Sequence, residues 1–297
     1  SKVLDLFSLI GGMRTGGKGA IAFVDVMRAA FAEDRELTLK TLFYSRDIRG
    51  GMGERATFRT FVRELAQFAP ETVNRVIPFI PTYGRWDDLY CLLGTACEQT
   101  VWDTIRSQWF QDHEDFHSPS IMAKWLASVT TSSAETRALG RATAKALGLT
   151  ERNYRKALSA LRKQLGVIEQ KMSAGKWEDI VYEHVPSQAN MLYKTAFYKH
   201  EPTRRQAFLD SLEKGETTVN ASTQFPYELI RKLVNGSESD NALVEAMWKA
   251  QPDYFGGIKE NSLVVADVSG SMHGLPLEVC LSLAIYTAER NKGIWKD

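Results

Sequence analysis

Apolar residues recur at helical spacing through most of the first 255 residues, with short joints of glycine, proline or serine between segments. The clearest segment carries one apolar stripe, formed by Tyr154, Leu158, Leu161, Leu165 and Ile168. Helices are predicted at about 20–33, 37–45, 54–69, 71–78, 86–95, 100–109, 120–128, 134–147, 151–170, 188–199, 203–213, 226–234 and 241–250. Many helices with tight turns predict stacked antiparallel pairs, which is a mainly α, HEAT-like repeat.

The pattern changes after Gly256. Leu263–Ala266 is a short apolar run that ends on Asp267 and a Ser/Gly loop, and a helical pattern follows from Pro276. This order predicts the first strand, loop and helix of an α/β domain. We therefore expect a helical repeat domain at 1–255 and the incomplete start of an α/β domain at 256–297.

The predicted strand needs neighbours on both sides, because an unpaired apolar strand exposes its backbone groups. The residues that follow it are too few to supply them. We expect either that the 297 residues are a fragment of a longer protein or that another chain pairs with the strand.

Asp267, Ser269 and Ser271 alternate after the predicted strand, so their oxygens can turn toward one point. Oxygen ligands suit a hard divalent cation, with Mg²⁺ favoured and Mn²⁺ or Ca²⁺ as alternatives. An ordinary strand and helix joined by a polar turn would give the same pattern. The sequence predicts a metal site here and leaves the simple turn as the alternative.

The first of two basic stretches lies at 44–59. Arg55 and Arg59 share a helical stripe, and Arg46 and Arg49 lead into a glycine-rich turn whose N–H groups could hold an anion. The alternative is a connecting turn in which nearby acids, Asp47 and Glu54, pair with the arginines.

The second basic stretch, at 137–176, holds ten basic residues against two acids. Arg155 and Arg162 lie seven residues apart, as do Lys156 and Lys163, so each pair shares a helix face. Such a surface attracts a phosphate backbone, and a solvated charged face is the alternative. The predicted RNA-binding side chains of both stretches are Arg46, Arg49, Arg55, Arg59, Arg155, Lys156, Arg162 and Lys163.

His113, Glu114 and His117 match the H-E-x-x-H pattern of zinc peptidases, which require both histidines on one helix face. Ser118-Pro119 follows at once and interrupts such a helix. We expect an acidic loop and rank a zinc hydrolase last.

Composition narrows the class of protein. The chain is 44% hydrophobic, its net charge is +1, and it lacks a run of about 18 apolar residues, so we expect no membrane span. Three cysteines without a C-x-x-C pair suit a reducing compartment, which predicts a cytoplasmic protein. We expect most of the seven tryptophans to lie in the core, with a base-stacking role beside Lys124 or Lys176 as the lesser alternative.

Several blocks together resemble one family. They are LKTLFYSRDIRGGMGER (39–55), IPTYGRWDDL (80–89), MAKWL (122–126), YRKALSALRK (154–163), KMSAGKWEDI (171–180), VPSQA (185–189) and ADVSGSM (266–272). They are similar to an uncharacterised cellular and viral family in which a helical region precedes a von Willebrand factor A-type domain. That family resembles in plan the TROVE-domain Ro autoantigen proteins, whose helical ring binds non-coding or misfolded RNA. In von Willebrand A-type domains, the residues matching Asp267, Ser269 and Ser271 hold a metal that captures a partner's carboxylate.

The resemblance implies an RNA-binding scaffold without enzymatic activity, part of a ribonucleoprotein, and leaves room for an oligomer. The alternative is a metal-dependent module that binds an acidic protein partner without RNA. The later Thr and Asp ligands of such metal sites have no counterpart in the chain, so three ligands of five argue against a filled site.

Overall fold

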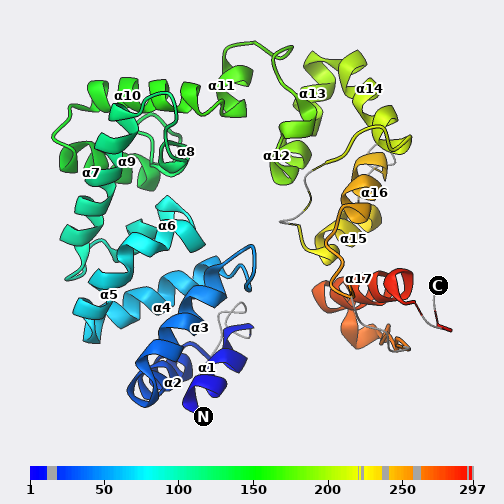
Figure 1. Ribbon diagram of the computed structural model, residues 1–297, viewed down its shortest axis with the longest axis horizontal. Coiled ribbons are helices and arrows are strands. Elements are labelled where there is room, and N and C mark those ends of the chain that lie inside the picture. Colours follow the sequence, from blue (N-terminus) through cyan, green and yellow to red (C-terminus); the bar gives the residue numbers. More distant parts are fainter. Residues whose placement is uncertain are drawn as a thin grey trace. The chain divides into compact units, whose positions relative to one another are not determined.

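The computed structural model describes residues 1–11, 19–219, 221, 224–235, 241–256, 262–292 and 294–295. The regular secondary structure of these residues is helical throughout (Figure 1). The chain divides into two compact units, unit 1 (Ser1–Gln170) and unit 2 (Lys171–Asp297). No described helix combines the length and the apolar character needed to cross a bilayer.

Unit 1 contains ten α-helices and two described 3₁₀ segments, and the following helix, α11, crosses into unit 2. Their bounds are α1 (Lys2–Ile10), α2 (Gly19–Glu33), α3 (Arg35–Arg46), α4 (Arg55–Phe68), α5 (Pro70–Val76), η2 (Ile77–Phe79), α6 (Ile80–Tyr83), η3 (Trp86–Leu92), α7 (Glu98–Glu114), α8 (Met122–Trp125), α9 (Ala134–Ala146), α10 (Glu151–Gln164) and α11 (Ile168–Ser173). Side-chain caps fix the starts of α9 and α10. The hydroxyl of Ser133 accepts a hydrogen bond from the N–H of Thr136, and the hydroxyl of Thr150 accepts one from the N–H of Asn153.

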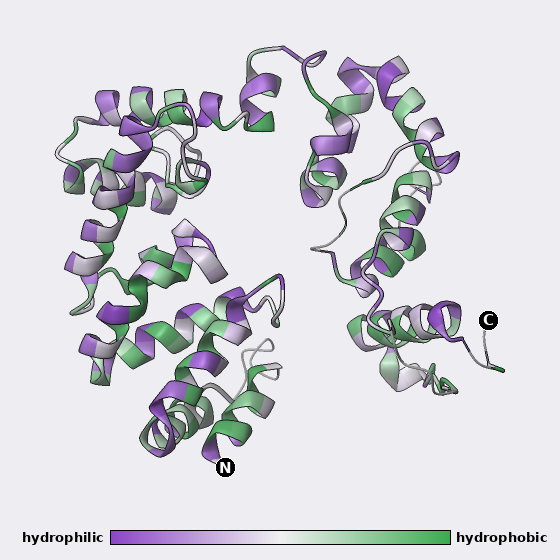
Figure 2. Cartoon of the chain, in the orientation of Figure 1, coloured by the Kyte–Doolittle hydropathy of each residue, from purple (hydrophilic) through white to green (hydrophobic). Residues whose placement is uncertain are grey.

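The core of unit 1 forms where the apolar stripes of these helices meet. Phe58, Phe61 and Leu65 of α4 are fully buried, and the ring of Phe61 meets that of Phe23 edge to face at 5.5 Å. Figure 2 shows the resulting division of the helices into apolar and polar sides. Packing of one stripe per helix therefore leaves the opposite faces free for polar side chains.

Tyr154, on the buried face of α10, anchors that helix to the loop after α8. Its hydroxyl donates to the carbonyl of Ala127 at 2.8 Å, and its ring stacks on Trp109 of α7 at 5.6 Å. Leu158 and Leu161 continue the same buried stripe. α10 is thus fixed along one side.

Unit 2 is built from shorter helices. They are η4 (Tyr182–His184), α12 (Ser187–Leu192), α13 (Lys194–His200), α14 (Pro202–Glu213), α15 (Pro226–Asn235), α16 (Asn241–Lys249), η6 (Gly270–Met272) and α17 (Leu275–Arg290). Arg205 of α14 is buried in this unit and donates to Asn190 Oδ1 at 2.7 Å. Its guanidinium lies 5.2–5.4 Å from the rings of Tyr182, Phe197 and Phe208.

The prediction that an α/β domain begins at 256–297 is wrong. Residues 262–269 form no strand, and no described segment pairs with Leu263–Ala266. Val265 is 88% exposed, which shows that this apolar run is not covered by the described residues. A strand requires a partner edge for its backbone hydrogen bonds, whereas a helix satisfies its own. The predicted helix after the loop is present as α17, with Pro276 in its first turn.

Two predicted helices are each divided in the structure. The pattern at 151–170 becomes α10 and α11, because Gly166 adopts the left-handed conformation (φ +62°) between them. The pattern at 188–199 becomes α12 and α13, which are separated at Tyr193. The predicted domain boundary at residues 255 and 256 stays a prediction, since most of the joint, 257–261, lies outside the described residues.

Candidate nucleic-acid interface

Two of the predicted RNA-binding arginines lie in a buried ion-pair network. Arg46 Nε donates to Asp88 Oδ2 at 2.8 Å, and both side chains are buried. Arg59 Nε donates to the other oxygen, Asp88 Oδ1, at 2.7 Å, and its Nη2 reaches Asp87 at 2.9 Å. Asp88 also accepts from the N–H of Arg85. These arginines hold α3 and α4 to η3 through carboxylates, with Arg46 buried and Arg59 partly exposed.

The glycine-rich turn before α4 uses its N–H groups internally. Those of Gly51 and Gly53 donate to the carbonyl of Asp47, and that of Met52 donates to the carbonyl of Tyr44. A Cβ on Gly51 would lie 2.0 Å from the oxygen of Tyr44, so this close turn requires glycine. The predicted nest of N–H groups for an anion is therefore not formed.

Arg49 and Arg55 remain exposed near this turn. Arg49 donates to the carbonyl of Thr82 at 3.1 Å, and Arg55 is the first residue of α4. Burial, and the nearby charge of Arg55, lower the pKa of Arg85, whose guanidinium lies 4.1 Å from the ring of Trp125. This corner of unit 1 has positive charge at its surface, but Arg49 and Arg85 contact separate partners.

Arg162, predicted to share a phosphate-binding face, instead performs a structural task. Its guanidinium donates to the carbonyls of Ala123 and Leu126 and to the hydroxyl of Ser128, each at 2.8 Å. Burial lowers the pKa of this guanidinium. These three hydrogen bonds to α8 and to the loop after it fix α10 against residues 123–128.

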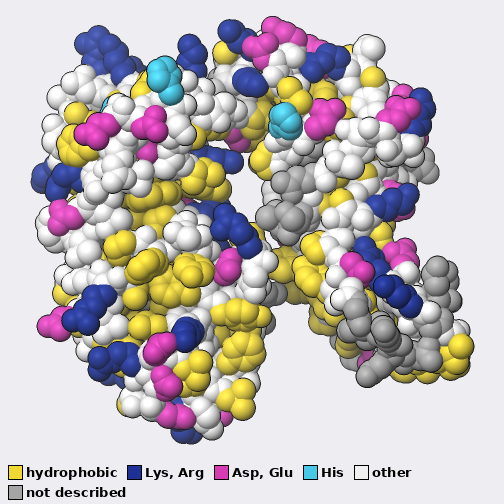
Figure 3. Space-filling model, in the orientation of Figure 1, with side chains coloured by type: hydrophobic (Ala, Val, Ile, Leu, Met, Phe, Trp, Pro, Cys, Tyr) yellow, Lys and Arg dark blue, Asp and Glu magenta, His cyan; other side chains and the backbone are white. Residues whose placement is uncertain are grey.

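The remaining basic side chains of α10 form an exposed stripe, which we call the α10 stripe: Arg152, Arg155, Lys156 and Lys163. Successive residues turn by about 100° in a helix, so these four side chains fall within about 100° of arc, opposite Tyr154 and Leu161. None of the four forms an ion pair with another described residue. Lys and Arg side chains project from the edge of unit 1 at α10 (Figure 3).

The basic residues of α9 are less free. Arg137 donates to the carbonyls of Thr131 and Ser132, and Arg141 pairs with Glu151 at 3.3 Å. Lys145 is exposed in the last turn of this helix. The free positive charge of this stretch is therefore concentrated on α10.

The H-E-x-x-H pattern does not form a metal centre in the structure. His113 and Glu114 end α7, while His117 lies beyond the helix. His113 Nδ1 lies 2.7 Å from the carbonyl oxygen of Trp109, so this ring nitrogen is engaged in a hydrogen bond within α7. No group of three or more His, Cys, Asp or Glu residues suited to a metal exists among the described residues.

Asp267, Ser269 and Ser271 do come together on an exposed loop. Ser269 N donates to Asp267 Oδ1 at 2.9 Å, and the two serine hydroxyl oxygens lie 3.1 Å apart. Hydrogen bonds from the hydroxyl and N–H of Ser269 lower the pKa of Asp267. One carboxylate and two hydroxyls fall short of the six or more oxygens that Mg²⁺ or Ca²⁺ takes. The loop alone does not fit a closed site, and metal binding here stays a prediction.

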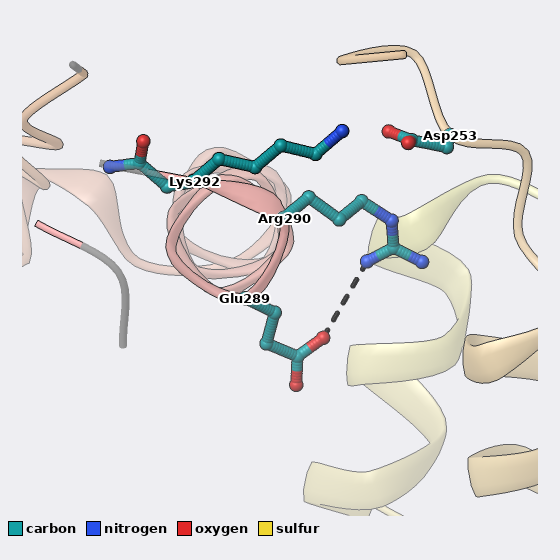
Figure 4. A pocket seen from close by; sticks show the side chains of 5 residues that line it. Asp253, Glu289, Arg290 and Lys292 are labelled. Carbon is teal, nitrogen blue, oxygen red and sulfur yellow. Dashed lines mark ion pairs between the residues drawn. The ribbon is translucent and has the colours of Figure 1, made fainter. Parts of the chain in front are cut away.

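A recess of about 380 Å³ lies at the end of α17, lined by Asp253, Glu289, Arg290, Asn291 and Lys292. Arg290 and Lys292 extend toward Asp253, and Arg290 pairs with Glu289 at 3.5 Å (Figure 4). The guanidinium of Arg290 also lies 3.9 Å from the ring of Tyr286. Two cations face two carboxylates, so the recess has little net attraction for an anionic ligand.

Residues 107–255 match a family described as a domain of unknown function, DUF2828. The match covers half of the chain and includes α10. The chain belongs to this family.

A viral protein is similar to this chain over most of the chain's length. The uncharacterised protein L728 of Acanthamoeba polyphaga mimivirus is 29% identical over 313 aligned positions. The alignment covers 91% of this chain and 54% of the viral protein, so the chain spans about half the length of that relative. No solved structure matches the chain.

Proposed function

We propose that the protein binds RNA through the α10 stripe. The observation that carries this proposal is four exposed cations on one helix face without a carboxylate partner in the described part of the chain. Each of them is free to displace a counterion from a phosphate, which is the main source of affinity for nucleic acid.

The geometry favours a chain of phosphates over a single small anion. The first and last residues of the stripe, Arg152 and Lys163, are separated by about 16 Å at the helical rise of 1.5 Å per residue. A small anion cannot touch both ends of such a row. A nucleic-acid backbone can follow it.

The contacts of α10 with its neighbours support this role. Arg162, beside the stripe, and Tyr154, on the buried face, fix the helix to α8 and to the loop after it through four hydrogen bonds. The stripe is thus presented on a rigid element, so little order has to be gained when a polyanion binds.

Titration of a labelled single-stranded RNA by fluorescence anisotropy tests the proposal. Arg155→Gln, Lys156→Gln and Lys163→Gln are combined in one variant. The matched control combines Lys2→Gln, Lys40→Gln and Lys249→Gln, which removes the same charge from exposed lysines that are paired with carboxylates. We expect the stripe variant to bind at least about tenfold more weakly and the control to stay near the parent protein.

Two results would contradict the proposal: no binding of RNA by the parent protein at low salt, or equal losses in the two variants. A parallel titration in EDTA separates this function from a metal-dependent one. Binding through α10 requires no divalent cation, so we expect the affinity to be unchanged.

A further inference from the structure

A pair of aromatic rings in unit 2 is stacked at the surface. The indole of Trp177 and the imidazole of His200 are almost parallel, with ring centroids 4.0 Å apart and an interplanar angle of 5°. Trp177 lies in the segment between α11 and η4, and His200 is the last residue of α13. This is the closest aromatic pair in the described part of the chain.

The pair is held in place from behind. Arg204 of α14 donates to the carbonyls of Trp177 and Ile180, at 3.1 and 2.8 Å, which fixes the segment carrying the indole. The buried ring of Phe197 meets Trp177 edge to face at 6.4 Å. The stack is therefore preformed, and a ligand does not have to assemble it.

His200 is exposed although the indole of Trp177 covers one face of its ring. Among the described rings, that of Trp177 stacks on His200. A flat group that extends the stack would lie on the face opposite the indole.

A lysine precedes each of the two ring residues in the sequence. Lys176 and Lys199 directly precede Trp177 and His200, are exposed, and form no ion pair with described residues. The acids nearest in sequence are Glu178, Asp179 and Glu201, and Glu201 lies 3.8 Å from Arg204. Cations beside an exposed ring are typical of surfaces that bind single-stranded nucleic acid, where a base stacks and its phosphates meet the lysines.

We propose that the Trp177–His200 stack is a platform for an unpaired base of single-stranded RNA, with the base on the face of His200 opposite the indole. Lys176 and Lys199 contact the adjoining phosphates. This rests on the proposed function, because it assumes that the ligand is RNA. Stacking is tolerant of sequence because every base has a π-face, so the platform selects unpaired bases without selecting one base.

Two substitutions at one position separate stacking from other roles. His200→Ala removes the imidazole, whereas His200→Phe keeps a flat ring. His184→Ala is the control, since His184 is also exposed in unit 2. Affinities are measured for a single-stranded RNA and for a fully paired duplex of the same length, and circular dichroism confirms that each variant is folded.

We expect His200→Ala to weaken binding of the single strand about 5- to 150-fold, and His200→Phe and His184→Ala to stay close to the parent. The duplex affinity stays unchanged, because it offers no unpaired base. Parent-like binding of the single strand by His200→Ala would overturn the platform while leaving the α10 proposal intact. Equal losses for single strand and duplex would also overturn it.

Two further results bear on the choice of ligand. If the parent protein binds no RNA, the proposed function and the platform both fail. If a proline-rich peptide binds in a manner that depends on His200 while RNA affinity does not, the stack serves a protein partner, and the platform for bases is overturned.

Discussion

The arginines of this protein divide into two groups that differ in the environment of each guanidinium. Arg46, Arg59 and Arg162 satisfy buried or half-buried acceptors, while Arg152 and Arg155 extend into solvent. A buried charge is tolerated only with well-placed partners, whereas an exposed one keeps its water and remains available to a ligand. Substitution of an arginine in the first group should therefore lower the stability of the fold, and substitution in the second group should weaken the binding of RNA.

Asp88 is the acid on which the buried network depends. Asp88→Ala leaves Arg46 buried without its carboxylate, and we expect it to lower the free energy of unfolding by about 3–5 kcal/mol. Asp103→Ala is the control, because its pair with Arg106 is exposed and should be worth about 0.5 kcal/mol. Urea unfolding measures the loss of unfolding free energy in both variants. Equal effects of the two substitutions would show that the network does not stabilise the fold.

Cys91 gives a prediction that depends on pH. Burial raises the pKa of its thiol to about 12. The thiol therefore stays neutral in the folded protein where the unfolded chain ionises, so its contribution to stability is complete below about pH 8.5 and is lost as the pH rises toward 12. We expect iodoacetamide at pH 9 to alkylate Cys91 at least about tenfold more slowly in the native protein than in urea. Cys91 is partly buried, and equal rates by mass spectrometry would contradict its protection by the fold.

At the scale of the element, the basic side chains of α10 have two different tasks, and the neighbouring residues Arg162 and Lys163 report on them. Arg162→Ala removes three hydrogen bonds and leaves the carbonyls of Ala123 and Leu126 without that donor, so we expect a loss of about 2–4 kcal/mol. Lys163→Ala should leave the unfolding free energy within about 0.5 kcal/mol and weaken RNA binding. Urea unfolding and RNA titration of both variants test this division. A large loss of stability for Lys163→Ala and weaker RNA binding for Arg162→Ala would contradict it.

α9 lies unusually close to the loop that α10 binds. A Cβ on Gly140 would lie 2.7 Å from the carbonyl carbon of Ser128. Gly140→Ala should therefore destabilise the protein by about 1–3 kcal/mol, although alanine is the better helix former. Ser159→Ala, on the exposed side of α10, is a control expected to be neutral or slightly stabilising. A rise in melting temperature for Gly140→Ala would contradict the close packing.

Helices could be predicted from the sequence because their hydrogen bonds and apolar stripes are local. The breaks at Gly166 and Tyr193 were missed, since the apolar spacing continues across both. The strand at Leu263–Ala266 was predicted from an apolar run alone, and the run carries no information on whether a partner edge exists. That partner is a property of the tertiary structure.

At the scale of the whole molecule, the sequence located the basic stretch of α10 but not the role of each residue in it. Heptad spacing places Arg155 and Arg162 about 20° apart around α10, yet only the guanidinium of Arg162 donates to backbone acceptors, the carbonyls of Ala123 and Leu126. Arg152, which belongs to the stripe, was not among the predicted binding residues. The stack of Trp177 on His200 left no local signal, because 23 positions separate them in the sequence.

The salt dependence of RNA affinity tests the central claim most directly. For a single strand, the logarithm of the affinity falls against the logarithm of the salt concentration with a slope of about −0.7 for each phosphate contacted. The variant with Gln at 155, 156 and 163 should have a slope shallower by about 2, while the control with Gln at 2, 40 and 249 keeps the parent slope. An identical slope in all three proteins would show that RNA does not bind on α10.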